Sequence, residues 1–277
     1  MLSNVKLTIL TENRANNPNL IGEQGLSILV ETDHGNLLFD TGQSDAFLKN
    51  AMEMGIDLVS VDKIVISHGH YDHTGGLPQM VDMREHTQIY CHPAAINKKY
   101  AVYPAGRLDI GVTWEKNDLA SRGAHFIYKT HAVEIYPDVW ISGEIPRYTE
   151  YEFIDEKYQQ RVLESFIHDD IHDDMGLYLN TKRGVIVLLG CGHAGVINTV
   201  KHAMRVTDNH TLYAVVGGMH LQHSQEERID KVVRNLEKLH PAHVLPMHCT
   251  GFYAIHRMLQ CCKDKVKLLN VGDVFEL

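Results

Sequence analysis

Residues 61–76 read VDKIVISHGHYDHTGG, and this stretch decides the fold. The β-branched segment Val61–Ser67 predicts a short, half-buried strand, and four metal-ligating side chains follow it directly. His68 and His70 lie two positions apart, so in an extended chain their imidazoles point to the same side and can hold one ion. Asp72 and His73 follow where glycines turn the chain. Their side chains are therefore expected to face a position next to the ion held by His68 and His70. Imidazole with carboxylate suits zinc, iron or manganese.

The same arrangement, a hydrophobic strand followed by a turn that carries histidine, recurs three more times. These turns are Gly190–His193, Gly217–His220 and Pro246–His248. The carboxyl ends of strands meet at one edge of a sheet, where α/β folds usually bind ligands. We therefore expect four histidine-bearing loops to meet at one rim and to form a metal site.

The rest of the chain predicts strands that alternate with helices, and no repeat or linker divides it. We predict a single domain over residues 1–277. The middle, about residues 101–172, is less regular and is expected to shape the substrate pocket together with the loop Leu20–Gln24. The acidic stretch His168–Asp174 is interpreted as a loop beside the pocket mouth. Elsewhere, strands are expected at Leu26–Thr32, Asn36–Asp40, Val185–Leu189, Leu212–Val216 and Ala242–Leu245, and helices at Ser44–Met54, Val196–Val206, Gln225–Leu239 and Phe252–Cys262.

Composition narrows the class of protein. The net charge of −9 disfavours a broad nucleic-acid surface. The longest apolar run, Val185–Leu189, is far shorter than the ~20 residues of a membrane span, and no secretory signal is evident, so we expect a cytoplasmic protein without membrane contacts. Five cysteines with no paired spacing indicate reduced thiols. The expected partner is a small-molecule substrate, with a phosphate-bearing one included, and a homo-oligomer is compatible with the sequence.

At this point the motif resembles a known signature. His68-x-His70-x-Asp72-His73 is similar to the H-x-H-x-D-H motif of the metallo-β-lactamase superfamily, and Leu37–Gly42 (LLFDTG) resembles the strand-Asp-Thr-Gly element upstream of it. The resemblance covers essentially the whole chain and implies an α/β protein with the four-layer αββα metallo-β-lactamase fold. It further implies that His68, His70 and His193 bind a first metal, that Asp72, His73 and His248 bind a second, and that the buried Asp40 orients the metal loop from the second shell.

The sequence departs from the family pattern at the ligand that bridges the two metals, which is usually an aspartate. The corresponding strand ends in Gly190–His193, which holds none. Cys191, His193, Glu144 or His220 could take that place, and the sequence does not decide among them. For Cys191 itself, core packing beside the ligands is the favoured interpretation.

The resemblance implies a metal-dependent hydrolase whose metal-bound hydroxide attacks a small ester or phosphoester. Two divalent ions are expected, zinc first, with iron or manganese as alternatives. Asp72 would orient the hydroxide as well as bind metal. His220 is a structural histidine, a ligand, or a catalytic acid or hydrogen-bond donor.

Two other functions remain open. Segments such as Gly143–Arg147 and Gly190–Gly195 resemble a dihydropterin or dihydropteroate synthase-like subgroup, which implies a pterin-type transferase (7,8-dihydropterin-aminobenzoate phosphate synthase-like) releasing diphosphate. The missing bridging aspartate would also suit a non-catalytic small-molecule sensor. Redox chemistry at a di-iron site is disfavoured, because the flavodiiron relatives carry glutamate at the position of His70.

Overall fold

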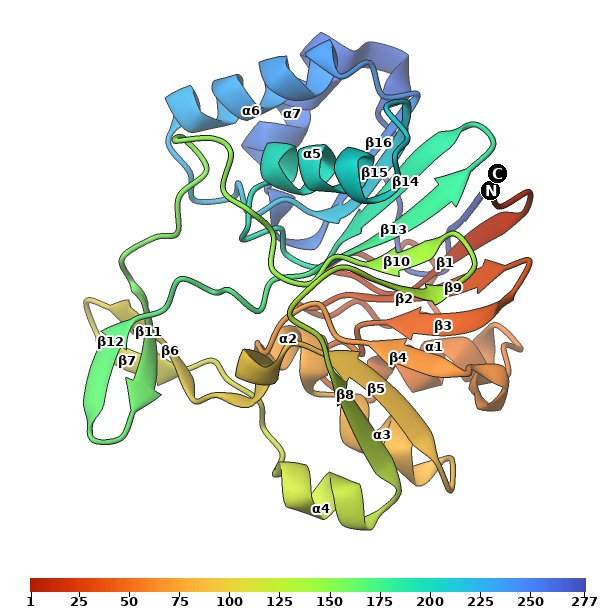
Figure 1. Cartoon of the computed structure of the whole chain (residues 1–277), viewed down its shortest axis with the longest axis vertical. Helices are drawn as coiled ribbons and strands as arrows, with labels where there is room; N and C mark the ends of the chain where they lie inside the picture. The colour runs from red at the N-terminus through yellow and green to blue at the C-terminus, as the bar shows by residue number, and fades with distance from the viewer.

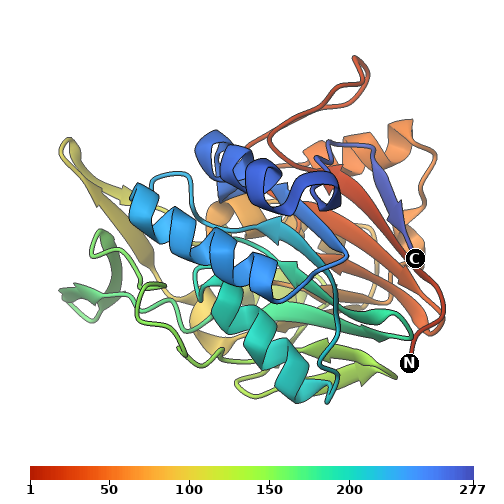
Figure 2. The same ribbon diagram turned by 90° about the horizontal axis from the view of Figure 1, so that it is seen from above.

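A computed structural model describes residues 1–277 and shows two β-sheets packed face to face with helices on both outer sides (Figure 1). The fold class is therefore the expected αββα sandwich. Both chain termini lie at the same end of the sandwich (Figure 2).

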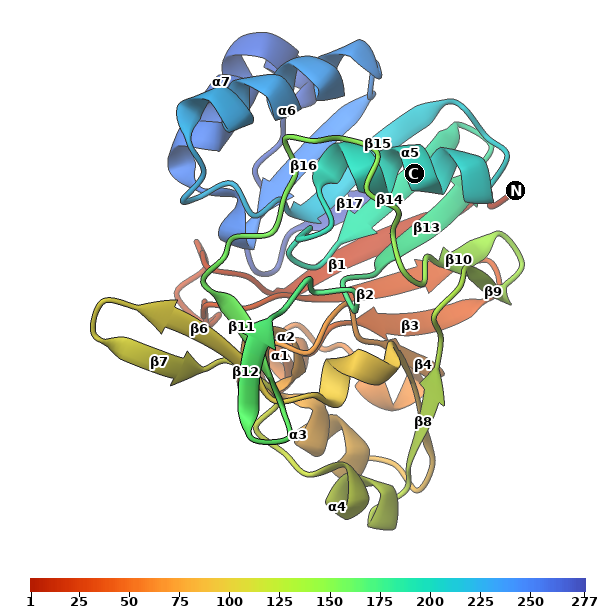
Figure 3. The same cartoon turned by 60° about the vertical axis from the view of Figure 1, so that its left-hand side comes forward.

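The first sheet has seven strands in the order β17-β1-β2-β3-β4-β5-β8. Helices α1 (Ala46–Glu53), α3 (Leu77–Asp82) and α4 (Lys116–Ser121) lie on its outer side, and the single turn α2 (Tyr71–Thr74) lies at its edge (Figure 3). The strands are β1 (Val5–Thr11), β2 (Ser27–Thr32), β3 (Gly35–Phe39), β4 (Lys63–Val65), β5 (Thr87–Cys91), β8 (Ala124–Tyr128) and β17 (Val274–Glu276).

The second sheet has six strands in the order β16-β15-β14-β13-β10-β9. Helices α5 (Val196–Val206), α6 (Glu226–Lys238) and α7 (Phe252–Cys262) cover its outer face (Figure 1). The strands are β9 (Val133–Tyr136), β10 (Val139–Ile141), β13 (Gly176–Thr181), β14 (Gly184–Leu189), β15 (Leu212–Gly218) and β16 (His243–Met247).

Hydrophobic burial explains the layering. All six residues of β14 are buried, because one face of the strand packs on the first sheet and the other on the helices. Leu188 belongs to the core between the sheets, and its neighbours Val187 and Leu189 belong to the core under α5–α7. The alternation of side chains along the strand thus supplies two cores at once.

The middle of the chain is more regular than the sequence suggests. It forms a third sheet of two β-hairpins in the order β12-β11-β6-β7, which projects from the sandwich beside the rim (Figure 2). Its strands escape sequence analysis because β7 and β12 are exposed throughout and show no buried alternation. They are β6 (Lys99–Tyr103), β7 (Gly106–Asp109), β11 (Tyr158–Val162) and β12 (Ser165–His168).

Most predicted elements are present with small shifts at their ends. The hairpin pairs β2 with β3, and α5 and α7 have the predicted bounds. The strand expected over Val61–Ser67 is shorter, because only Lys63–Val65 pairs with both neighbours. The predicted N-cap Ser44 lies before Asp45, the residue that precedes α1. No helix is both long and apolar enough to cross a bilayer.

Candidate metal centre

The four histidine-bearing turns meet at one rim of the sandwich. His68 follows β4 of the first sheet, whereas His193, His220 and His248 follow β14, β15 and β16 of the second sheet. The prediction of a shared rim is confirmed, although the strands belong to two sheets. The rim therefore collects side chains from both halves of the molecule.

The first group consists of His68, His70 and His193. One ring nitrogen of each lies within 4.8 Å of those of the other two, and His68 Nε2 is 2.9 Å from His70 Nδ1. His70 Nε2 and both ring nitrogens of His193 are buried without a hydrogen-bond partner. Buried polar atoms are normally paired, so these free lone pairs fit a bound cation.

The same burial keeps this group neutral. It lowers the pKa of His70 to about 3. Burial, reinforced by the neighbouring histidines, also holds the pKa values of His68 and His193 well below the ordinary value. A neutral imidazole is the form that coordinates metal.

The second group consists of Asp72, His73 and His248, whose ligand atoms also lie within 4.8 Å of one another. His73 Nε2 is 3.2 Å from His248 Nε2, and His248 Nε2 is 3.4 Å from Asp72 Oδ2. Burial alone would raise the pKa of Asp72, but the charge of His73 and the hydrogen bond from His248 outweigh it and bring the pKa below its usual range. The group thus offers one carboxylate and two imidazoles.

A second layer of side chains orients these ligands. Asp40 Oδ2 lies 2.7 Å from His73 Nδ1 and accepts the hydroxyl of Ser67 at 2.7 Å. The ring of His248 is held through Nδ1, 2.9 Å from Asn13 Oδ1. Burial opposes protonation of His73, but the carboxylates of Asp40 and Asp72 outweigh it and raise its pKa to about 9. Carboxylates behind metal-binding histidines are typical of such sites.

Among the four residues considered for the shared position, Cys191 alone adjoins both groups. Its Sγ is 3.2 Å from His73 Nε2 and also lies within 4.8 Å of ligand atoms of His68, His193 and His248. Glu144 points away, since its half-exposed carboxylate lies 3.1 Å from His92 Nε2. His193 belongs to the first group, and His220 clusters with Cys191 and His193 only.

A buried charge network holds the loop that carries His68 and His70. Lys99 Nζ donates to Asp169 and to Asp173, each at 2.8 Å, and Asp173 in turn accepts the backbone N–H of Gly69 at 2.8 Å. A Cβ at Gly69 would collide with the carbonyl oxygen of Ala95, so only glycine fits between the two ligands. The acidic stretch His168–Asp174 is thus not simply a loop at the pocket mouth.

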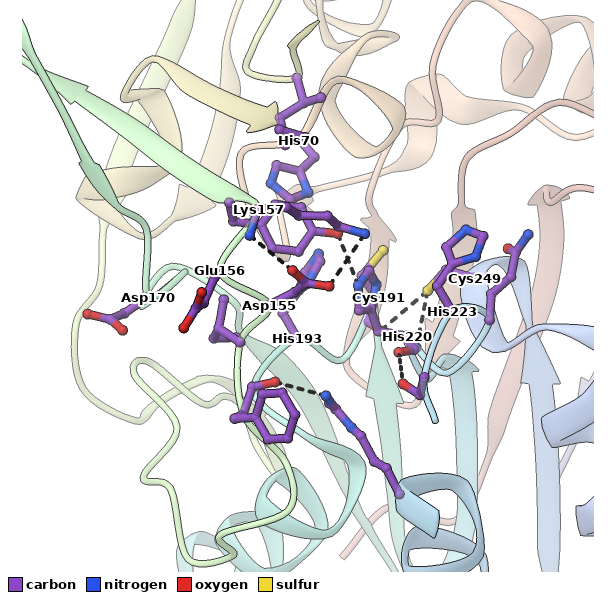
Figure 4. A pocket seen from close by; sticks show the side chains of 18 of the residues that line it. His70, Asp155, Glu156, Lys157, Asp170, Cys191, His193, His220, His223 and Cys249 are labelled. Atoms are coloured by element: carbon purple, nitrogen blue, oxygen red, sulfur yellow. Dashed lines mark hydrogen bonds and ion pairs between the residues drawn. The ribbon is translucent and has the colours of Figure 1, made fainter. Parts of the chain in front are cut away.

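Both groups open onto a cavity of about 1510 Å³, which is lined by His70 and His193 of the first group (Figure 4) and by Asp72 and His248 of the second. Cys191 and His220 line it beside these two groups, and Gln24 lines it from the predicted loop. Tyr158 lines it as well, with its hydroxyl 3.0 Å from His220 Nε2. Sequence analysis misses Tyr158, because a lone tyrosine in a polar stretch gives no signal.

Comparison with known proteins agrees with this geometry. The sequence profile described as the metallo-β-lactamase superfamily matches residues 20–191. A 7,8-dihydropterin-6-methyl-4-(β-D-ribofuranosyl)-aminobenzene-5'-phosphate synthase of Methanocaldococcus jannaschii is 29% identical and aligns with 99% of this chain and 97% of its own. An uncharacterised protein of the same organism is 30% identical over 92% of this chain and 94% of its own.

The solved structure of a metal-dependent hydrolase of the β-lactamase superfamily superposes with a TM-score of 0.86 at 28% identity, and the match covers 99% of each chain. The resemblance to dihydropterin synthase-like proteins is confirmed by the first relative. The profile match ends at residue 191. In the structure, the later residues His193 and His248 lie next to the motif residues 68–73, which the profile does match. This chain belongs to the metallo-β-lactamase superfamily.

Proposed function

We propose that this protein is a metal-dependent hydrolase that cleaves a small ester or phosphoester at a pair of divalent cations. One observation carries the proposal: two neighbouring buried groups of ligand side chains, with unpaired ring nitrogens in the first, both contribute residues to the wall of a large cavity. A purely structural cluster would pair these nitrogens with protein groups. It would also have no need of access from solvent.

Each residue of the two groups has a proposed role as a ligand. His68, His70 and His193 would hold one cation, and Asp72, His73 and His248 the other. Cys191 would take the position between them, where the family pattern has aspartate. Cations bound there lower the pKa of a coordinated water and so supply a nucleophile at neutral pH. Imidazole and thiolate donors together favour zinc or iron over harder ions such as magnesium.

Asp72 has a second role beyond binding. Its Oδ2 faces His248, its Oδ1 is 4.0 Å from His73 Nε2, and its side chain lines the cavity. A carboxylate in this position can accept a hydrogen bond from the attacking group and fix its direction. Asp40 supports the arrangement indirectly, because it fixes the ring of His73.

The test combines metal analysis with turnover. We expect purified wild type to hold two metal ions per chain and to hydrolyse bis-p-nitrophenyl phosphate. His193→Ala should hold fewer ions and lose about a hundredfold or more in kcat, since a ligand of the first site is gone. His210→Ala, which removes an exposed histidine far from the rim, is the matched control and should behave as wild type.

Two results would contradict the proposal. One is wild-type protein that binds no metal under reducing conditions. The other is fully loaded protein that turns over no ester, which would favour a sensor that uses the same pocket for binding alone.

A second candidate, a pterin-type transferase, is favoured by a separate observation. The similar synthase aligns with almost the full length of both chains. The cavity also exceeds the ~300–1,000 Å³ usual for one small ligand, so it has room for a second reactant. Incubation with a dihydropterin methyl diphosphate and a ribofuranosyl-aminobenzene phosphate should then release diphosphate. Release without the second reactant would indicate hydrolysis instead.

A further inference from the structure

Tyr158 lies in the cavity wall beside the first histidine group. It is the first residue of β11 and is only 7% exposed, although its side chain lines the cavity. Its ring stacks on His70 with 5.8 Å between centroids and 25° between planes, and it meets His193 edge-on at 5.4 Å. Two of the three histidines in the first group therefore fix the ring against the candidate metal site.

His220 fixes the hydroxyl. Its Nε2 lies 3.0 Å from Tyr158 Oη, which has no other hydrogen-bond partner in the protein. The backbone of His220 has φ 45°, an uncommon value for a residue with a side chain, and its N–H donates to Cys249 Sγ at 3.3 Å. Such strain is kept mainly where the surroundings require one conformation, often at functional sites.

The hydrogen bond between Tyr158 and His220 can leave the phenol proton of Tyr158 available for the substrate. A hydroxyl offers one donor hydrogen and two acceptor lone pairs. When His220 Nε2–H donates to Tyr158 Oη, the phenol hydrogen has no protein acceptor and is free to reach into the cavity. His220 Nδ1 is buried without a partner, and its ring lies 4.1 Å from that of His193, so His220 is held in the same cluster.

We propose that Tyr158 is a catalytic residue that donates its proton to the leaving oxygen of the substrate, and that His220 is its positioning residue. This inference rests on the proposed hydrolase function. As the nucleophile's oxygen bonds to phosphorus, the bond from phosphorus to the leaving oxygen breaks and that oxygen takes the phenol proton. The Nε2–H of His220 stabilises the phenolate through its hydrogen bond, and a water molecule of the cavity returns the proton to Tyr158 Oη.

The inference defines a substrate class. An alkoxide or simple phenolate leaves poorly without a proton, whereas nitrophenolate or diphosphate leaves readily without one. Tyr158 therefore matches esters of weakly acidic alcohols. A diphosphate leaving group, as in the transferase reaction, would gain little from it.

The experiment compares zinc-loaded wild type, Tyr158→Phe and the control Tyr100→Phe on two diesters. Tyr100 lies on the neighbouring strand β6, opposite Gln159 and outside the cavity, and its hydroxyl makes no hydrogen bond. On diphenyl phosphate, Tyr158→Phe should lose about a hundredfold in kcat. On bis-p-nitrophenyl phosphate it should lose less than about threefold, with zinc content unchanged. Tyr100→Phe should match wild type on both.

Binding of inorganic phosphate provides a readout that does not depend on turnover. Calorimetry on the zinc-loaded proteins should show about tenfold weaker phosphate binding for Tyr158→Phe, the loss expected for one hydrogen bond to a charged oxygen. Weakened phosphate binding in a protein that cleaves neither diester would uphold the contact of Tyr158 while refuting the hydrolase function. Equal losses on both diesters, unchanged phosphate affinity, or loss of zinc from Tyr158→Phe would overturn the inference.

Discussion

The histidines of the H-x-H-x-D-H motif have pKa values that are shifted in opposite directions. His68 and His70 stay neutral because burial removes the water that would stabilise their charge. His73, three positions further on, is protonated at neutral pH without metal, because Asp40 and Asp72 face it. A cation at the second site would replace that proton and satisfy the same carboxylates. The surroundings of each imidazole ring therefore determine whether it is neutral or protonated.

The pKa shifts of these residues predict how the stability of the metal-free protein changes with pH. Below pH about 6.5, the unfolded chain protonates His68, His70 and His193, while the folded chain keeps them neutral, so folding becomes less favourable as pH falls. Asp174 and Glu152 have the opposite effect, since burial raises the pKa of Asp174 to about 6 and also raises that of Glu152, but they are two groups against three. We expect urea unfolding of chelator-treated protein to show a steep loss of stability from pH 6.5 to 4.5.

The variant His70→Gln should make this loss shallower, because one of the three buried imidazoles is gone. His86→Gln, at an exposed position, should leave the slope as in wild type. A slope that is the same in all three proteins would contradict the assignment of the acid response to the buried histidines.

Secondary-structure elements are positioned at the rim partly by charge. Lys99 of β6 is 1% exposed in its side chain, and its partners Asp169 and Asp173 are 5% and 0% exposed. The network ties the projecting hairpins to the loop that carries His68 and His70, because Asp173 also binds Gly69. Removal of the lysine would leave two carboxylates buried without a counter-charge.

We therefore expect Lys99→Met to lower the free energy of unfolding by about 3–5 kcal/mol, the usual consequence of breaking a buried ion pair from one side. Lys98→Met is the matched control. Lys98 is half exposed, and its contact with Glu115 is 3.9 Å long, so its loss should stay within about 0.5 kcal/mol. Denaturant titration measures both values, and similar small losses would show that the buried network contributes little.

Elements with strong periodicity could be predicted from sequence, and elements defined by distant pairing could not. The helices α5–α7 and the strands β14–β16 show clear helical spacing or unbroken apolar runs. Strand β11 reads YQQRV, which shows no apolar alternation. It forms a local hairpin with β12, but its position depends on its pairing with β6, far earlier in the chain. The sequence therefore predicts that the middle segment shapes the cavity, but it does not single out Tyr158 as a residue of the cavity wall. The choice of Cys191 likewise needed the distance to His73.

At the scale of the whole molecule, the candidate site joins the two halves of the sandwich. The loop after β4 supplies His68 to His73, and the second sheet supplies Cys191, His193 and His248. Metal bound there would link the sheets and stabilise the fold through mass action, by about 4 kcal/mol when free metal exceeds its dissociation constant a thousandfold. Under the proposed function, bound metal at this rim would thus serve both the reaction and the stability of the fold.

The most direct test is anomalous diffraction from crystals of the zinc-loaded protein, recorded on both sides of the zinc edge. Two peaks about 3.5–4 Å apart should appear, one among His68, His70 and His193 and the other among Asp72, His73 and His248, with Cys191 Sγ close to both. Zinc found only elsewhere on the molecule, or no anomalous peak at the rim in fully loaded crystals, would contradict the account.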